Sequence, residues 1–158
     1  MDRIYAPWRS AYFTAPKNGE CPFCAVQREA RNELVGMLYR GARWFVLLNA
    51  YPYTSGHIMI VAARHVKRIG DLTAEELGEL PDLLARCERA IEAVYRPDGL
   101  NVGINIGESA GAGIAGHLHV RLCPRWHGDT NFMTTVADAR VVSEGLEESY
   151  RRLRPQFE

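Results

Sequence analysis

The sequence predicts an α+β domain, and three features of the chain indicate this class. Five β-rich runs are spread along it, at residues 34–39, 44–48, 56–61, 101–107 and 117–123. A long amphipathic segment, residues 73–95, separates the third run from the fourth. A second amphipathic segment, residues 139–153, follows the last run, so we expect a sheet with one long helix and one C-terminal helix.

Composition narrows the classes of partner. The chain has 158 residues, enough for one domain with a sizeable core. Its 19 Lys and Arg balance 19 Asp and Glu, so no overall positive field attracts nucleic acid or a membrane surface. We also expect no signal peptide and no membrane span. Four cysteines without a secretory signal indicate reduced thiols and a cytoplasmic setting.

The N-terminal arm, residues 1–20, carries four aromatic residues among prolines and a glycine: Tyr5, Trp8, Tyr12 and Phe13. We expect these side chains to pack onto the body of the domain or onto a second subunit. A frayed terminus is the alternative, but frayed ends seldom carry four aromatic residues.

Cys21 and Cys24 form a C-x-x-C pair, which we expect on a tight turn. Such a pair suits half of a tetrahedral zinc site, and a redox pair is the alternative, although no thioredoxin-like βαβ pattern surrounds it. A zinc site needs two more ligands. Cys87 is expected in a helix core, so the candidates are the histidines, which are His57, His65, His117, His119 and His127.

The first two β-rich runs, residues 34–39 and 44–48, flank a short turn at residues 41–43 and predict a hairpin. The third run is almost entirely apolar, so it predicts a central strand that delivers Arg64 and His65 at its end.

The long helix begins with a capping box made by Thr73 and Glu76. Pro81 predicts a kink or a late start of the regular helix. Its apolar stripe predicts core packing rather than a cofactor site and comprises Leu77, Leu80, Leu83, Leu84, Cys87, Ala90, Ile91 and Val94.

The fourth strand has polar residues or glycine at every second position: Asn101, Gly103, Asn105 and Gly107. Alone, this pattern favours a solvent-facing strand. However, the strand leads directly into a histidine-rich strand, so the two should be adjacent, and small polar residues suit a place where a ligand comes close.

The fifth strand follows a glycine-rich turn, residues 111–116, and alternates strictly. Its aliphatic residues should face the core, whereas His117, His119 and Arg121 should share the other face. Two imidazoles and a guanidinium, beside the backbone N–H groups of the glycine-rich turn, are suited to bind a phosphate. The alternative is an exposed polar strand face. We expect Pro124 to end this strand, because proline cannot donate to the ladder.

This alternation, His-Leu-His-Val-Arg-Leu-Cys at residues 117–123, resembles the signature of the histidine triad (HIT) family, and the resemblance covers roughly residues 20–126. Residues 51–53, 124–126 and 128–133 look like the bacterial branch that includes diadenosine tetraphosphate phosphorylases and HIT hydrolases. The resemblance implies a five-stranded antiparallel sheet and a homodimer. It divides one domain, 1–158, into the arm 1–20, a HIT core 21–126 and a C-terminal loop and helix 127–158.

The resemblance also implies a chemistry. The middle histidine, His119, would attack the α-phosphate of a dinucleoside polyphosphate, such as diadenosine tetraphosphate, or of a related nucleoside phosphate. Water or orthophosphate would then resolve the nucleotidyl-histidine. A neutral imidazole is a competent nucleophile at pH 7, and we expect a backbone carbonyl to hold its other nitrogen. His117 and Arg121 would complete the catalytic set.

The resemblance assigns binding roles to further residues. The nucleotide would contact Asn49 through its ribose, and Asn105 and the backbone at Gly111, Gly113 and Ile114 through its phosphates. The zinc-containing members of the family imply a structural Cys₂His₂ zinc site, which here would comprise Cys21, Cys24, His65 and His117.

The sequence departs from the family at the third triad position, where Arg121 replaces histidine. Related galactose-1-phosphate uridylyltransferases have glutamine there and transfer nucleotides. Arginine stays protonated, so Arg121 would either clamp a phosphate or crowd the site. Three functions remain open: a nucleotidyl transferase or hydrolase, which we favour, a nucleotide-binding or regulatory protein with weak catalysis, and a zinc-stabilised dimeric interaction module. The sequence does not choose between phosphorolysis and hydrolysis.

Overall fold

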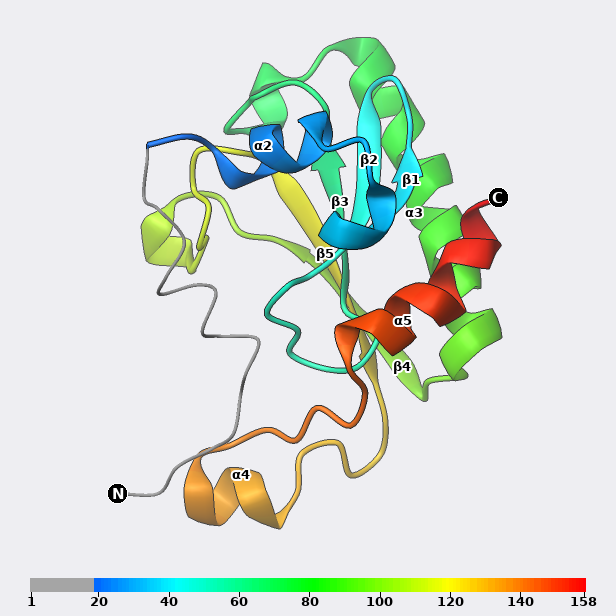
Figure 1. Ribbon diagram of the computed structural model, residues 1–158. Helices are drawn as coiled ribbons and strands as arrows, with labels where there is room; N and C mark the ends of the chain where they lie inside the picture. Colours follow the sequence, from blue (N-terminus) through cyan, green and yellow to red (C-terminus); the bar gives the residue numbers. More distant parts are fainter. Residues whose placement is uncertain (1–18) are drawn as a thin grey trace.

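The computed structural model describes residues 19–158 (Figure 1), so the aromatic residues of the N-terminal arm, at positions 5, 8, 12 and 13, lie outside the described residues. The strands are β1 (Met37–Arg40), β2 (Trp44–Leu48), β3 (Ile58–Ala62), β4 (Gly99–Ile104) and β5 (His119–Arg125). The α-helices are α2 (Pro22–Arg28), α3 (Ala74–Tyr95), α4 (Phe132–Ala137) and α5 (Leu146–Leu153). Short 3₁₀ turns are η2 (Asn32–Val35), η3 (Ile69–Asp71), η4 (Glu108–Ala110) and η5 (Arg154–Phe157).

The five strands form one sheet in the order β1-β2-β3-β5-β4, and every neighbouring pair is antiparallel. The predicted α+β class and five-stranded antiparallel sheet are therefore confirmed. The apolar third run is the central strand, as expected, and the hairpin β1-β2 is present. Strand β4 pairs with β5, so the strand of alternating asparagine and glycine lies beside the histidine strand.

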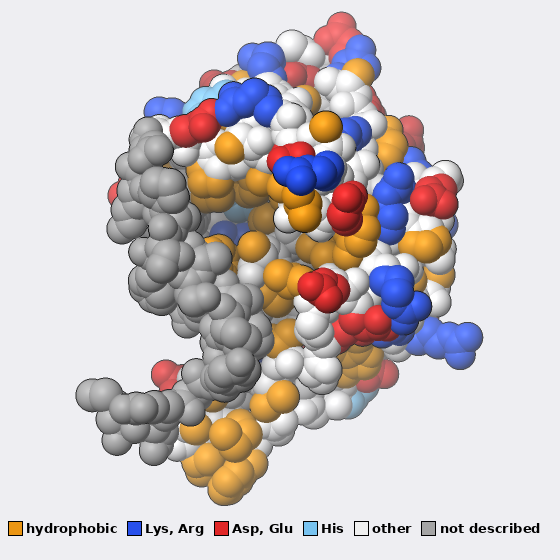
Figure 2. Space-filling view, viewed as in Figure 1, with side chains coloured by type: hydrophobic (Ala, Val, Ile, Leu, Met, Phe, Trp, Pro, Cys, Tyr) orange, Lys and Arg blue, Asp and Glu red, His pale blue; other side chains and the backbone are white. Residues whose placement is uncertain are grey.

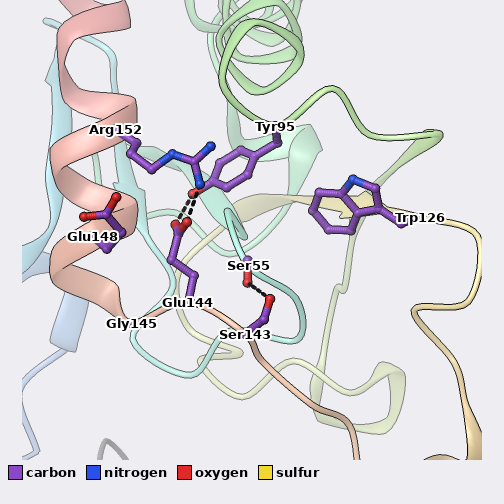
Figure 3. Close-up of a pocket in the computed structure, with 8 residues that line it drawn as sticks. All are labelled: Ser55, Tyr95, Trp126, Ser143, Glu144, Gly145, Glu148 and Arg152. Carbon is purple, nitrogen blue, oxygen red and sulfur yellow. Dashed lines mark hydrogen bonds and ion pairs between the residues drawn. The ribbon is translucent and has the colours of Figure 1, made fainter.

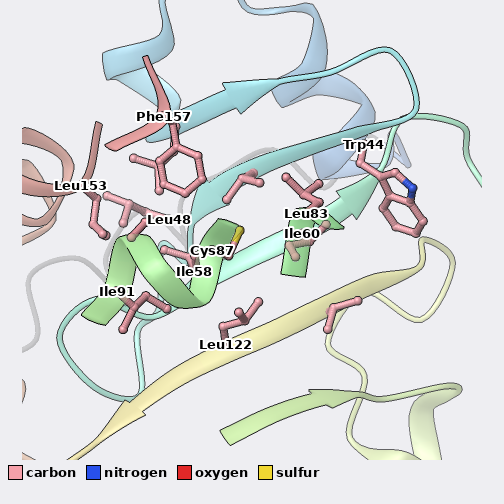
Figure 4. Close-up of a cluster of buried hydrophobic side chains, with 14 of the residues drawn as sticks. Trp44, Leu48, Ile58, Ile60, Leu83, Cys87, Ile91, Leu122, Leu153 and Phe157 are labelled. Atoms are coloured by element: carbon pink, nitrogen blue, oxygen red, sulfur yellow. The ribbon is translucent and has the colours of Figure 1, made fainter. Parts of the chain in front are cut away.

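Both faces of the sheet are covered, because residues of β2 and β3 alternate between two buried clusters. On one face, Leu48 and Ile60 pack with Leu83 and Cys87 of α3 and with Leu153 of α5 (Figure 4). The opposite face has a smaller cluster, in which Phe23 of α2 packs on apolar residues of β1, β2 and β3, namely Met37, Phe45, Leu47, Met59 and Val61.

Helix α3 starts where its capping box predicts, with Thr73 Oγ1 accepting from the Glu76 N–H and Glu76 accepting from the Thr73 N–H. It runs for 22 residues through Pro81, so of the two predicted alternatives, a kink or a late start, the late start is wrong. Pro81 is exposed, and water can solvate the carbonyl that it leaves unpaired. Leu77 was predicted in the core stripe but is 42% exposed; Glu76 is buried beside it.

Every strand except β2 differs in its bounds from the sequence prediction. Strand β3 begins at Ile58 rather than residue 56, β4 ends at Ile104 rather than residue 107, and β5 begins at His119 rather than residue 117. Strand β1 begins at Met37 rather than residue 34, because residues 32–35 form a 3₁₀ turn that ends at Gly36 with a φ of 64°. Strand β5 continues through Pro124 to Arg125. Its pairing with β3 ends at Leu122, so Pro124 lies where one side of β5 has no strand partner and needs no second ladder bond.

The C-terminal helix is shorter than predicted. Helix α5 begins at Leu146, whereas residues 139–145 are not helical and the Ser143 and Glu144 side chains bond to other parts of the chain. Helix α4 lies between the polar loop expected at residues 127–132 and the helix expected from residue 139, where no element was predicted, and its Phe132 and Val136 are 75% and 58% exposed. Figure 2 shows a group of apolar side chains at the lower end of the molecule, where Figure 1 places α4. Within residues 19–158, no helix has the length and apolar character needed to cross a membrane.

Candidate active site and metal centre

Four predicted metal ligands come together where α2 meets the start of β5. The ligand atoms of Cys21, Cys24, His65 and His117 all lie within 4.8 Å of one another. Cys21 caps the N-terminus of α2, and Pro22 occupies its first turn. The pair is therefore on the first turn of a helix and not on the tight turn predicted, and residues three apart on a helix share one face.

The distances in this cluster fit a tetrahedral ion. Cys21 Sγ is 3.2 Å from His117 Nδ1, Cys24 Sγ is 3.3 Å from His65 Nδ1, and Cys24 Sγ is 3.7 Å from His117 Nδ1. Zinc bonded to sulfur and nitrogen at usual lengths separates those two ligand atoms by about 3.5 Å. The donor set, two thiols and two imidazoles, is one that zinc prefers.

The ring orientation of His117 is fixed from the other side. Its Nε2 lies 2.7 Å from the Ala62 carbonyl, to which it donates, so the lone pair of Nδ1 faces the two sulfurs. Such a hydrogen bond to a carbonyl is the usual support of a histidine ligand. Burial, and next the Cys21 thiol, raises the pKa of Cys24, which favours the neutral thiol. A bound cation would act in the opposite direction, because metal ions bind the thiolate.

The other histidines that the sequence offered as ligands lie elsewhere. His127 Nδ1 is 3.0 Å from an Asp98 carboxylate oxygen, and His57 lies beside Asn49. Cys87 is fully buried in the core, as predicted. Among the described residues, the cluster is thus the set that the family resemblance implied.

His119 lies next to this cluster on the same face of the sheet as Arg121. It pairs with Val61 of β3, is 3% exposed and has the Phe23 ring centroid 5.1 Å from its own. Its Nδ1 lies 2.9 Å from the His117 carbonyl, the hydrogen bond predicted from the sequence. When Nδ1 donates, the lone pair is on Nε2. Burial lowers the pKa of His119, which favours this neutral form.

Arg121 is anchored to the loop between β2 and β3. Its Nη1 donates to the Tyr53 hydroxyl over 2.9 Å, and its guanidinium carbon is 5.5 Å from the Tyr53 ring centroid. Its Nε is buried and has no hydrogen-bond partner within residues 19–158. A buried N–H without a partner is costly, so this atom is available to an acceptor that enters the site.

An open cavity of about 450 Å³ lies beside these residues. Its wall is formed by β4, β5 and the loops next to them, through Tyr53, Asn101, Val102, Gly103, Asn105, Gly111, Arg121 and Cys123. Of the predicted nucleotide-binding residues, Asn105 and Gly111 line it, and the Asn105 Nδ2 donates to the Gly111 carbonyl over 3.1 Å. Gly111 has a φ of +82°, which favours glycine.

Four predicted nucleotide-binding residues do not line this cavity: Asn49, Gly113, Ile114 and the predicted nucleophile His119, which lies two residues before Arg121 on β5. Asn49 is 8% exposed and its Oδ1 accepts the Tyr51 N–H over 2.9 Å. Ile114 packs against the cluster around Phe23, and Gly113 is exposed on the turn before it. Of the predicted nucleotide-binding residues, only Asn105 and Gly111 therefore line the cavity.

His57 and Tyr53 also belong to the site. The sequence offered His57 only as a candidate zinc ligand and assigned no role to Tyr53. His57 is 1% exposed, its Nδ1 accepts the Tyr53 N–H over 3.2 Å, and the Asn49 amide lies 3.3 Å from its Nε2. Burial, with smaller effects from Arg121 and His119, lowers the pKa of His57 to about 4. The signal in the sequence was a histidine placed directly before a fully apolar strand.

A second cavity of about 410 Å³ lies between α5, the end of α3 and the loop after β2 (Figure 3). Its Glu144 carboxylate accepts from the Tyr95 hydroxyl over 2.5 Å, from Ser149 over 2.7 Å and from Arg152. Burial and Glu144 raise the pKa of Tyr95. Polar groups at this cavity hydrogen-bond to one another, and no predicted site residue lines it, so it is a junction between structural elements.

The comparisons with known proteins agree with this geometry. The HIT domain model matches residues 32–128. A protein named AP-4-A phosphorylase, from Mycobacterium tuberculosis, is 36% identical over 166 residues, which cover 99% of this chain and 85% of that protein. An asymmetrical bis(5′-nucleosyl)-tetraphosphatase from Schizosaccharomyces pombe is 32% identical over 69% of this chain and 59% of its own length.

Among solved structures, a Zn-bound histidine triad family protein from Mycobacterium smegmatis superposes with a TM-score of 0.69 and 28% identity, covering 87% of this chain and 93% of that one. Thus the sheet, the alternating strand, the family model and a relative similar along nearly the whole sequence all lead to the same assignment: this chain belongs to the HIT domain family.

Proposed function

We propose that this protein transfers or hydrolyses the nucleotidyl group of dinucleoside polyphosphates, such as diadenosine tetraphosphate, or of related nucleoside phosphates. The observation that carries the proposal is the hydrogen bond from His119 Nδ1 to the His117 carbonyl, which leaves a nucleophilic lone pair on Nε2. The 36% identity to a protein named AP-4-A phosphorylase supports the substrate class.

In the proposed reaction, His119 Nε2 attacks the α-phosphorus and the rest of the substrate departs. Orthophosphate or water then attacks the nucleotidyl-histidine and regenerates the imidazole. The positive charge of Arg121 and the amides near Gly111 stabilise the negative charge that develops on the phosphate oxygens. His117 supports the step indirectly, because its carbonyl holds the His119 ring.

The binding roles are proposals of the same kind. Asn105 and Gly111 line the cavity and would contact the phosphates. Gly113 and Ile114 would contribute backbone amides from the same turn. Asn49 would reach a ribose only if its side chain left the Tyr51 N–H that it now accepts, so we propose that it acts after a rearrangement of this loop.

A second candidate is a nucleotide-binding or regulatory protein with weak catalysis. The observation in its favour is Arg121, which stands where the family has a third histidine and cannot exchange a proton at neutral pH.

Incubation with diadenosine tetraphosphate, with and without orthophosphate, tests both candidates. Anion exchange would resolve the products, and mass spectrometry of the intact protein under alkaline quench would reveal an adenylyl group. We expect ADP and ATP with orthophosphate if the enzyme is a phosphorylase, and AMP and ATP if it is a hydrolase. His119→Asn should remove both the adduct and turnover. Retention of nucleotide without any product would favour the binding protein.

We also propose that the Cys21, Cys24, His65 and His117 cluster holds a structural zinc ion. The ligand distances and the orientation of His117 support this, and so does the Zn-bound relative. When bound, zinc would pin α2 to the start of the catalytic strand. Since thiolate ligands require reduced cysteines, and Cys21 and Cys24 are free thiols, we infer that the protein works in the cytoplasm.

We propose that the protein is a homodimer formed along β4. Within residues 19–158, β4 is the outer strand of the sheet next to β5. Val102 on β4 and Ile106 just after it are 51% and 42% exposed. An unpaired edge with apolar side chains favours pairing with another chain. Light scattering should give about twice 17.8 kDa for the parent. Val102→Lys should give a monomer, whereas Val141→Lys, at another exposed apolar position, should not.

A further inference from the structure

The inference concerns the leaving group, and it rests on the proposed function. We propose that Arg121 makes this site selective for substrates whose leaving group departs as a phosphate anion, such as dinucleoside polyphosphates. Nucleoside phosphoramidates and alkyl esters, whose leaving group must be protonated as it departs, would be poor substrates. Selectivity thus follows from one residue that supplies charge but no proton.

The position of Arg121 supports this role. It lies two residues after His119 on β5, so both side chains project from the same face of the strand. Its Nη1 is held by the Tyr53 hydroxyl, its Nε is buried without a partner within the described residues, and the side chain lines the cavity. A guanidinium fixed at one end and unsatisfied in the middle is suited to a phosphate oxygen.

Within residues 19–158, the groups around His119 that carry a proton are poor donors to a leaving group. The His57 imidazole is neutral near pH 7 and its Nδ1 accepts a hydrogen bond from the Tyr53 N–H. The His117 Nε2–H is committed to the Ala62 carbonyl. Cys123 is a thiol whose pKa is raised by burial, and a thiol is a far weaker acid than an imidazolium.

The first step can proceed without such a donor when the leaving group is a phosphate chain. His119 Nε2 gives its lone pair to the α-phosphorus, the N–P bond forms, and the bond from phosphorus to the bridging oxygen breaks. The electron pair stays on that oxygen, which departs as a phosphate anion beside the positive charge of Arg121. The Nδ1 proton stays on His119. An amine or alkoxide would leave as a strong base, so its departure requires a proton that Arg121 cannot give.

The test compares two adenylyl donors on the same protein: diadenosine tetraphosphate and adenosine 5′-phosphoramidate. The parent should react with the first and be much slower with the second. Arg121→His supplies a titratable donor at the same place, so the ratio of kcat/KM for the phosphoramidate to that for diadenosine tetraphosphate should rise about 100-fold. Arg121→Lys retains the charge without a useful donor and should keep the parent ratio. Arg121→Gln should slow both substrates.

The outcomes separate this inference from the proposed function. Equal reaction of the parent with both donors, or an unchanged ratio in both Arg121→His and Arg121→Lys, would overturn the selectivity assigned to Arg121 while the enzyme remained a nucleotidyl transferase. Absence of both adenylyl-His119 and products with diadenosine tetraphosphate would overturn the proposed function, and this inference with it. Circular dichroism melting shows whether each variant is folded. If Arg121→His is unfolded, the Arg121→Lys and Arg121→Gln variants decide.

Discussion

His57 is a neutral histidine held between polar neighbours inside the protein. Its ring lies 4.9 Å from that of Tyr53, centroid to centroid, and it contacts the Asn49 amide. Protonation would place a charge in a buried position close to the fixed charge of Arg121, and both effects oppose it. This one residue therefore links the loop after β2 to the electrostatics of the site.

The stability of the folded state should fall at acid pH through His57. Its pKa drops from 6.5 to about 4 on folding, so the unfolded chain binds this proton more tightly. The stabilisation is complete above pH 6.5 and is lost as pH falls toward 4, by about 3 kcal/mol. Urea unfolding at pH 7 and pH 4 should show a larger loss in the parent than in His57→Gln. Equal losses in the two proteins would contradict this reading of His57.

At the level of elements, helix α3 is connected to the sheet through its first turn. Glu76 caps the helix and also receives two hydrogen bonds from the Arg64 guanidinium, at 3.0 and 2.8 Å, which lowers the pKa of Glu76 to about 2. The Trp44 indole N–H donates to the Glu76 carbonyl over 2.9 Å. The start of α3 thereby orients the segment after β3, which carries His65.

Removing the cap should destabilise the protein modestly. Thr73→Ala deletes the oxygen that accepts the Glu76 N–H, so the free energy of unfolding should fall by about 1 kcal/mol. Thr73→Ser retains the hydroxyl and serves as the control, with stability close to that of the parent. Thermal and urea unfolding measure the difference. An alanine variant as stable as the serine variant would show that Glu76 and Arg64 are sufficient to hold this turn.

At the level of the whole molecule, the Cys/His cluster connects three segments that are distant in sequence. It joins the first turn of α2, the segment after β3 and the segment just before β5. Phe23 lies between the two cysteines in sequence and packs against the His117 and His119 rings, with centroids 5.4 and 5.1 Å away. An ion bound by the cluster would therefore also stabilise the packing of α2 against His119.

Metal removal should therefore lower stability and disturb the active site together. We expect purified protein to contain about one zinc per chain, and chelation to lower its Tm by several degrees, with zinc restoring it. Cys24→Ser should abolish zinc retention, whereas Cys123→Ser, outside the cluster, should retain zinc. A chain that melts at the same temperature with and without chelator, and contains no metal, would contradict a structural zinc.

Local patterns determined most of the secondary structure of this chain and the identity of its central residues. Strict alternation predicts the face shared by His119 and Arg121, and the run of apolar residues predicts that β3 is central. The capping box predicts the start of α3. These features depend on neighbours within a few residues, so they can be read from the sequence.

Tertiary contacts decided the remainder, because they act between residues far apart in the chain. Pro124 remains in β5 since its position beyond the pairing with β3 removes the need for a second hydrogen bond, and α5 starts late because Glu144 bonds to Tyr95. The buried, neutral state of His57 and the anchoring of Arg121 by Tyr53 likewise arise only when the loop after β2 packs over β5. Residue types alone define the possible chemistry, whereas burial and distant partners set which nitrogen carries a proton and which charge is left for a substrate.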